Sequence, residues 1–287
     1  MARIQVPRRP RPPGGQALAR LVIHASLAVA LVTAVVPFLW VTLNSLKGDD
    51  AIFNEPFSLP EKPRWANFVE AWRVGRFGIY PWNSVVVAVP TVLLSLACSS
   101  LAGYSFARLR FPGNRWLFYV FLIGLAVPTN AILIPLFYTV RGLGLLDNLL
   151  GVILPQVATS LPFGIFMMRA FFRTLPGELE DAARIDGCTD LGVYRHIMLP
   201  LSTGTLGTLL IFSFMASWND FLIPYLFIRE DRLRTIPLGL LYFQGAYVTE
   251  YRLLFAAIVI SFVPTLLLYL AFQRRFIEGI TVGAVRG

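Results

Sequence analysis

Apolar residues follow one another in long segments of this chain, and most charged residues are gathered in the shorter stretches between them. A segment of about 20 apolar residues can cross about 30 Å of hydrocarbon as an α-helix, which rises about 1.5 Å per residue. The pattern predicts an all-α integral membrane protein with six transmembrane helices. The expected spans are residues 21–43, 82–107, 116–140, 148–168, 201–228 and 253–273.

Proline recurs inside these expected spans, for example at Pro128 and Pro135 in the third. An interior proline removes a backbone hydrogen bond and kinks the helix. In a membrane such breaks persist where neighbouring helices or a water-filled cavity satisfy the freed backbone groups. So many breaks favour a bundle that rocks around a cavity.

The first 20 residues are basic and rich in proline, and we expect them to form a cytoplasmic tail. A cleaved signal peptide is the alternative interpretation. The apolar run at 21–43 is longer than a usual signal-peptide core and lacks a small-x-small cleavage site before Asn44, which favours an uncleaved first span. The expected organisation is a tail at 1–20, a transmembrane domain at 21–273 with a cytoplasmic loop at 169–200, and a cytoplasmic tail at 274–287.

Lysine and arginine are distributed unevenly among the loops. With the N-terminus inside, the inner segments hold 15 basic and six acidic residues, and the outer segments hold ten basic and nine acidic residues. The positive-inside rule therefore places both termini in the cytoplasm, and we expect the spans to contact membrane lipid. Because topology accounts for the net charge of +9, a nucleic-acid partner is not expected.

The sequence contains no recognisable catalytic or cofactor motif. Two cysteines and two histidines do not form a metal-binding cluster or a disulfide framework. Lys47 and Lys62 are the chain's lysines, and neither belongs to a phosphate-binding loop. We expect no enzyme activity and no cofactor in this chain, so ATP and Mg²⁺ would bind to partner subunits if ATP drives it.

The most informative segment is the loop at 169–200, which predicts two short helices joined at a glycine. Pro176 can occupy a first helical turn, and Gly187 can adopt the left-handed cap conformation. Leu179, Ala182, Ala183 and Asp186 are expected to share a flat face to which another protein could bind. The candidate residues of this loop are Glu180, Asp181, Ala182, Ala183, Asp186, Gly187, Ile197, Leu199 and Pro200.

Asp181-Ala182-Ala183, followed at fixed spacing by Gly187, Ile197, Leu199 and Pro200, resembles the E-A-A signature of permeases in binding-protein-dependent ABC importers. Aspartate replaces the usual glutamate, which keeps the charge. The C-terminal residues resemble those of the maltose-type second permease. The resemblance implies the type I ABC importer permease fold, with the loop bound to an ATPase subunit. It also implies that the tail reaches between two ATPase subunits, through Gly279, Thr281, Gly283, Ala284 and Arg286.

The resemblance further implies transport of a sugar or oligosaccharide by alternating access. The expected partners are a second homologous permease, a dimer of ATPase subunits and an extracytoplasmic substrate-binding protein or lipoprotein. Loops at 44–75 and 229–252 are candidates to contact that binding protein. The alternatives are an importer of glycerol phosphate or another small polar solute, and an ion-coupled secondary transporter. An ion-coupled secondary transporter usually shows inverted repeats and paired intramembrane charges, which this sequence does not show.

Trp218, Asn219 and Asp220 are candidates for the translocation pathway. An ionisable residue within an apolar span is costly and usually functional. Asp220 is nevertheless expected near the outer face, where it could cap a helix or pair with a basic loop residue. Both interpretations stay open at the level of the sequence.

Overall fold

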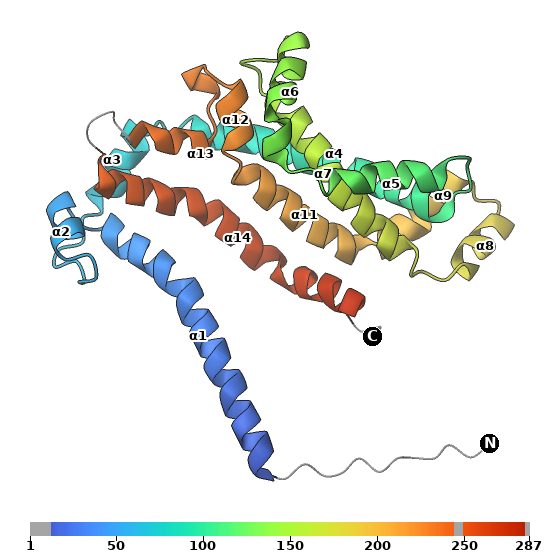
Figure 1. Ribbon diagram of the computed structural model, residues 1–287, viewed down its shortest axis with the longest axis horizontal. Coiled ribbons are helices and arrows are strands. Elements are labelled where there is room, and N and C mark those ends of the chain that lie inside the picture. The colour runs from blue at the N-terminus through green and yellow to red at the C-terminus, as the bar shows by residue number, and fades with distance from the viewer. Residues whose placement is uncertain (1–12, 244–248, 285–287) are drawn as a thin grey trace.

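The computed structural model describes residues 13–243 and 249–284, and every secondary-structure element in those ranges is a helix (Figure 1). The predicted all-α class is confirmed for this part of the chain. The helices are α1 Pro13–Ser45, α2 Asp49–Asn54, α3 Ala66–Val74, α4 Tyr80–Arg108, α5 Asn114–Gly124, α6 Thr129–Gly142, α7 Leu150–Phe172, α8 Glu178–Ile185, α9 Asp190–Val193, the π-helical turn η1 Tyr194–Met198, α10 Leu199–Leu201, α11 Thr203–Trp218, α12 Leu222–Phe227, the 3₁₀ turn η2 Asp231–Leu233, α13 Ile236–Gly239, the 3₁₀ turn η3 Leu240–Phe243 and α14 Tyr251–Ala284.

Four helices within the described residues are long and apolar enough to cross a membrane unbroken: Ala17–Ser45 of α1, all of α4 and α7, and Tyr251–Ala271 of α14. They correspond to the first, second, fourth and sixth predicted spans. The structure thus has four continuous spans, and up to six if two bent helix pairs each count as one.

The third predicted span is one of these bent pairs, and the fifth overlaps mainly the second half of the other. Helices α5 and α6 meet at an angle of 103°, at a break that ends in Pro128. Proline lacks the N–H that would continue the helix and restricts the preceding residue, so the break falls there. Figure 1 shows α6 projecting away from the other long helices. The other pair, Asp190–Leu201 and Thr203–Trp218, is bent by 76° at Ser202, near the start of the fifth predicted span, and α11 ends at Trp218 instead of reaching residue 228.

The centre of the bundle is the pair α4 and α7, which run side by side over most of their lengths (Figure 1). Glycine permits this approach. A Cβ atom on Gly103 would lie 2.6 Å from the Cβ of Met168, and one on Gly164 would lie 2.1 Å from Ser99 Oγ. Small residues at such contacts let helix backbones pack closely in a membrane. Because α7 leads directly to α8, this pair fixes where the 169–200 loop starts.

Helix α1 diverges from the bundle and contacts α14 through its C-terminal half (Figure 1). Phe38 stacks on Phe262 with 4.8 Å between ring centroids, and Trp40 meets Phe255 edge to face at 5.4 Å. Both ends of the chain contain more helix than predicted. Helix α1 begins at Pro13, inside the tail predicted at 1–20, and α14 continues to Ala284, through most of the tail predicted at 274–287. Residues 1–12 lie outside the described residues.

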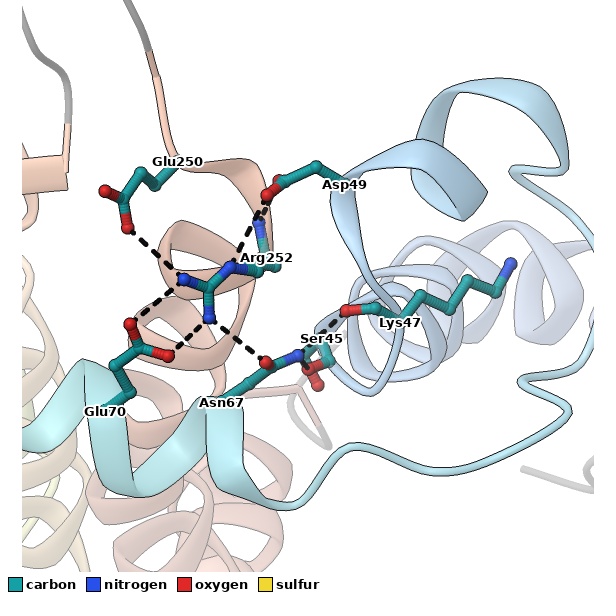
Figure 2. Close-up of polar contacts among 7 residues, drawn as sticks. All are labelled: Ser45, Lys47, Asp49, Asn67, Glu70, Glu250 and Arg252. Atoms are coloured by element: carbon teal, nitrogen blue, oxygen red, sulfur yellow. Dashed lines mark hydrogen bonds and ion pairs between the residues drawn. The ribbon is translucent and has the colours of Figure 1, made fainter.

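A polar cluster joins several elements at the end of the bundle opposite α8. Figure 2 shows the guanidinium of Arg252, on α14, between three carboxylates. It contacts Glu70 of α3 in a bidentate pair of 2.5 and 3.0 Å, and lies 3.4 Å from Asp49 and 3.8 Å from Glu250. The start of α14 is therefore tied to α2 and α3.

Asn67 extends this cluster to the end of α1. Its side-chain amide donates hydrogen bonds of 2.8 Å to the carbonyl oxygens of Ser45 and Lys47 (Figure 2). These carbonyls lie at the end of α1 and just beyond it, where no further intrahelical donor is available. The segment between α1 and α4 is consequently held against the bundle by polar contacts.

We expect replacement of Glu70 with glutamine to lower the melting temperature by about 2 °C at pH 7, because a half-exposed ion pair contributes about 0.5–1 kcal/mol. The hydrogen bond from Arg252 holds the pKa of Glu70 below its ordinary value of 4.5. A lowered folded-state pKa means that this stabilisation is present above pH 4.5 and is lost as the pH falls through the folded-state value. The test is thermal unfolding of the purified protein at pH 7 and at about pH 3.

Glu61→Gln is the matched control, because Glu61 is exposed and makes no ion pair with a described residue. An equal effect of Glu70→Gln at both pH values would show that the ion pair is not the source of the stability difference.

Candidate functional site

Helix α8 is built by local sequence signals. Its first turn holds Glu178, Glu180 and Asp181, whose negative charges complement the positive end of the helix dipole. Gly177 precedes the helix, and Arg184 lies in its last turn, where a positive charge is favourable. The predicted first short helix is confirmed at Glu178–Ile185.

Gly187 ends α8 in the left-handed conformation, with φ of +84°. Its N–H donates to the carbonyl of Arg184 at 3.1 Å, and the N–H of Cys188 donates to the carbonyl of Ala183 at 2.9 Å. These two bonds form a Schellman motif, which satisfies the last carbonyl groups of the helix. The left-handed cap predicted for Gly187 is confirmed.

The second part of the loop runs from Thr189 to α11. The hydroxyl of Thr189 accepts a hydrogen bond from the N–H of Gly192 and caps α9. Arg184 bridges the turn by an ion pair of 2.7 Å with Asp190. The chain then forms the π-helical turn η1 before it enters α10.

The face that α8 turns toward the bundle differs from the predicted one. Ala183 is buried with 5% of its surface exposed, and so is Glu180 with 8%. The expectation that Ala183 shares an open face with Ala182 is therefore wrong, because a ready-made apolar cluster covers Ala183. The cluster contains Tyr104, Met168, Phe172, Val193, Tyr194, Met198 and Leu209.

The exposed face of α8 carries Asp181, Ala182, Ile185 and Asp186. Ile185 is 87% exposed, and the sequence analysis missed it. Its signal was present in the sequence, since an isoleucine three positions after Ala182 lies on the same side of a helix. This face offers an apolar centre flanked by carboxylates.

Ile197, Leu199 and Pro200 complete the fixed-spacing motif on the bundle side. Ile197 and Leu199 are partly buried against the cluster that covers Ala183. Pro200 is exposed within α10. In the same segment, the hydroxyl of Tyr194 donates to Ser100 Oγ at 3.0 Å. The motif thus combines residues that pack the loop against the bundle, Ile197 and Leu199, with residues that are exposed on α8, Asp181 and Ala182.

Arg108 holds α8 in place, a role that the sequence did not reveal. Its Nε lies 3.0 Å from Oε1 of Glu180, and the two side chains are only 15% and 11% exposed. Its terminal nitrogen donates to the carbonyl oxygens of Phe172, at 2.6 Å, and Leu175, at 2.5 Å. One guanidinium therefore joins the end of α4, the end of α7 and the start of α8.

Asp220 follows α11 and accepts hydrogen bonds from the first residues of α12. Its Oδ1 accepts from the backbone N–H groups of Leu222, at 3.0 Å, and Ile223, at 3.3 Å, and its Oδ2 accepts from Gln156 Nε2 at 2.9 Å. The structural interpretation of Asp220 therefore fits the geometry. Its place beside a cavity also keeps the pathway interpretation open.

The other two pathway candidates lie elsewhere. Trp218 is 4% exposed, packs in the core that α11 forms with α14, and donates from Nε1 to the carbonyl of Ser261 at 3.2 Å. Asn219 is exposed and donates to the carbonyl of Met215 in its own helix at 2.8 Å. Neither side chain lines the cavity that Asp220 borders.

That cavity has a volume of about 350 Å³ and is lined mainly by hydroxyl and amide side chains. At its wall, Oε1 of Gln156 accepts from Ser217 at 2.6 Å and from Thr91 at 3.3 Å. Gln156 lies mid-way along a predicted span, and this unusual position was the overlooked sequence signal. The lining residues are Thr91, Thr129, Asn130, Gln156, Thr159, Ser160, Ser213, Ala216, Ser217, Asp220, Leu222 and Ile223.

The C-terminal candidates are only partly described. Gly279, Thr281, Gly283 and Ala284 belong to the last turns of α14, and Arg286 lies outside the described residues. Their contact with ATPase subunits stays a prediction. Among the described residues, no group of three or more His, Cys, Asp or Glu could hold a metal ion.

A bundle of membrane-length helices, a polar cavity within it and an ordered loop at one end define a membrane-embedded subunit of a transporter. Residues 96–282 match the family described as "Binding-protein-dependent transport system inner membrane component". The chain belongs to this family. It is an inner-membrane permease subunit of an ABC importer, and ATP hydrolysis belongs to a separate subunit.

Curated relatives match nearly the whole chain. The diacetylchitobiose uptake system permease protein NgcG of Streptomyces coelicolor is 37% identical over 265 residues, which cover 92% of this chain and 88% of that protein. The arabinooligosaccharides transport system permease protein AraQ of Bacillus subtilis is 34% identical over 256 residues, covering 88% and 90%. The trehalose transport system permease protein SugB of Mycobacterium tuberculosis is 33% identical over 257 residues, covering 88% and 93%.

A solved structure has the same fold. It is a chain of a bacterial ABC transporter involved in the import of the acidic polysaccharide alginate. The TM-score is 0.80 at 23% sequence identity, over 93% of this chain and 99% of that chain. The predicted permease fold is confirmed by this likeness. Importers of this kind combine such a permease with a partner permease, an ATPase and a binding protein.

Proposed function

We propose that this chain imports a sugar or oligosaccharide by alternating access. It would work with a second homologous permease, two ATPase subunits that bind ATP and Mg²⁺, and an external binding protein. The names of the relatives support the solute class, since they refer to diacetylchitobiose, arabino-oligosaccharides and trehalose. Import of glycerol phosphate or another small polar solute is the alternative within the same architecture.

The observation that carries this proposal is the polar cavity between α4, α7 and α11. Hydroxyl and amide groups at the depth of the spans cannot face lipid without cost, so they belong on a water-filled path or a protein interface. Groups such as Asn130 and Ser213 have no side-chain hydrogen bond to described residues and remain available to a solute. A solute rich in hydroxyl groups would find both donors and acceptors there.

Energy coupling would act through the loop at 169–200. We assign the ATPase contact to the exposed face formed by Asp181, Ala182, Ile185 and Asp186. Glu180 and Ala183 would transmit motion from that face to the bundle, through Arg108 and the apolar cluster. This assignment places α8 and both termini in the cytoplasm. It agrees with the course of α14, which runs from the α3 end toward the α8 end (Figure 1).

The decisive experiment is uptake into vesicles that contain the chain with its partner permease, its ATPase and its binding protein. We expect ATP-dependent accumulation of one carbohydrate from a panel of di- and oligosaccharides. Accumulation of glycerol phosphate alone would favour the alternative solute. Uptake that persists without ATP and collapses with an ionophore would overturn the ATP-driven mechanism.

We expect Asn130→Leu to reduce solute uptake about three- to tenfold, which corresponds to the loss of about one hydrogen bond. The substitution keeps the side-chain size and removes a polar group from the cavity wall without breaking a described hydrogen bond. Initial uptake rates across a range of solute concentrations measure the effect. Asn130→Gln is the matched control, because it keeps an amide group at the same position of the cavity wall. Equal uptake by both variants would remove this cavity from the pathway.

A further inference from the structure

A second polar pocket, of about 770 Å³, opens at the α8 end of the molecule, where α4 ends, α5 begins and α7 ends. Four arginines line it, against a single lining carboxylate, that of Glu180. The arginines are Arg108, Arg110, Arg169 and Arg173. Four positive charges less one negative charge leave three unbalanced positive charges in one pocket.

Two of the arginines are occupied by the protein itself. Arg108 binds Glu180 and the two carbonyl groups described above. Arg169 donates from Nε to the carbonyl of Phe106 at 3.2 Å and lies over the ring of Phe118, 3.7 Å from its centroid. They form an ordered wall of fixed positive charge.

The other two arginines are free to bind a ligand. The side chains of Arg110 and Arg173 make no hydrogen bond or ion pair with any described residue, and both residues are exposed. Two unpaired guanidinium groups beside two fixed ones repel each other unless an anion lies between them. A guanidinium offers parallel N–H donors that match a phosphate group in a bidentate arrangement.

The position of the pocket identifies the source of the phosphate. It opens where two membrane segments end and start, beside exposed aromatic residues of α5: Trp116 is 77% exposed and Tyr119 is 39% exposed. Tryptophan and tyrosine are enriched at the level of the lipid head groups. On the same helix, Leu117 and Val120 are also exposed and present an apolar surface suited to acyl chains.

We propose that this pocket binds the phosphate head group of an anionic phospholipid from the leaflet on the α8 side. Arg110 and Arg173 make the primary contacts, and the acyl chains lie along the apolar surface of α5. Basic pockets between membrane helices favour such head groups. Because Arg108 and Glu180 form part of the pocket wall, the bound lipid lies next to the contact that holds α8.

The same pocket is a poor fit to the ATPase interface assigned above. Glu180 lies on the buried side of α8, whereas Ala182 and Ile185 are exposed on other sides of that helix. None of the residues assigned to the ATPase contact lines this pocket. The proposal depends on this geometry and not on the identity of the solute.

Native mass spectrometry of the complete transport complex, incubated with equimolar phosphatidylglycerol and phosphatidylcholine, tests the proposal. We expect the wild-type complex to retain phosphatidylglycerol about tenfold more than phosphatidylcholine, and the double variant Arg110→Gln, Arg173→Gln to lose this preference. The control, Arg141→Gln with Arg195→Gln, removes the same charge from two exposed arginines outside the pocket and should keep it.

Further measurements distinguish a lipid from the other possible ligands of this pocket. Displacement of phosphatidylglycerol by millimolar inorganic phosphate would make this a site for a free anion and overturn the lipid proposal. Normal lipid retention by the double variant, together with loss of the ATPase subunit, would assign the pocket to the ATPase interface. If the double variant fails to assemble, each single variant is measured instead. We expect an intermediate preference from each, and wild-type retention by both would overturn the proposal.

Discussion

Replacing Gly187 with valine should reduce ATP-driven uptake at least tenfold while the protein remains inserted in the membrane. Gly187 has a φ of +84°, which a β-branched residue strongly disfavours. A Cβ atom at this position would meet nothing within 4 Å, so the cost is backbone strain of about 1–3 kcal/mol and not a steric clash. That cost is small against membrane insertion, but about 1.4 kcal/mol changes an equilibrium constant tenfold.

The control for this variant is Gly177→Val, the same substitution at the other end of α8. Gly177 has a φ of −66° and open space around its Cβ position, so valine fits there without strain. Membrane level, retention of the ATPase and uptake are measured for both variants. Wild-type uptake by Gly187→Val, with the ATPase fully bound, would show that the Schellman turn does not contribute to coupling.

Arg108→Ala should destabilise the loop by about 3–5 kcal/mol, because it leaves the carboxylate of Glu180 buried without its partner. It also deprives the carbonyls of Phe172 and Leu175 of a donor. We expect α8 to detach from the bundle, so that the ATPase subunit dissociates more readily and uptake is lost. Thermal stability and co-purification of the ATPase measure the two effects separately.

A double-mutant cycle identifies the contact responsible for this effect. Glu180→Gln removes the charge that Arg108 neutralises, so the double variant should be less damaged than the sum of the two single variants. Arg195→Ala, at an exposed arginine in the same loop, is the control for loss of charge. Strict additivity of the two single changes would mean that the ion pair does not hold α8.

Uniform apolar segments predicted the straight spans well, and breaks within them were harder to predict. Helices α4 and α7 fall close to the predicted residues because no charged residue interrupts their apolar segments. Pro128 and Pro135 look alike in the sequence, yet α6 begins directly after the first and contains the second. Whether a proline kinks or ends a helix depends on which neighbours satisfy the freed backbone groups, and these neighbours are distant in sequence.

The same distinction applies to the candidate site. The conformation of Gly187 follows from local chemistry, so spacing alone was sufficient to predict it. The orientation of Ala183 depends on side chains from α4 and α7, and the contact between Arg108 and Glu180 joins segments far apart in the chain. Gln156 and its hydrogen-bond partners likewise come from three different helices.

The π-helical turn at Tyr194–Met198 has a consequence for the length of the loop. A π turn holds about one residue more than an α turn, and each residue of a helix rotates the chain by about 100°. This extra residue therefore changes the rotation of α11 about its axis relative to α9. The number of residues between Gly187 and Pro200 therefore determines how the helices on either side are rotated relative to each other. This holds whichever side chains occupy the exposed positions. A fixed count of residues in such a loop specifies an angle.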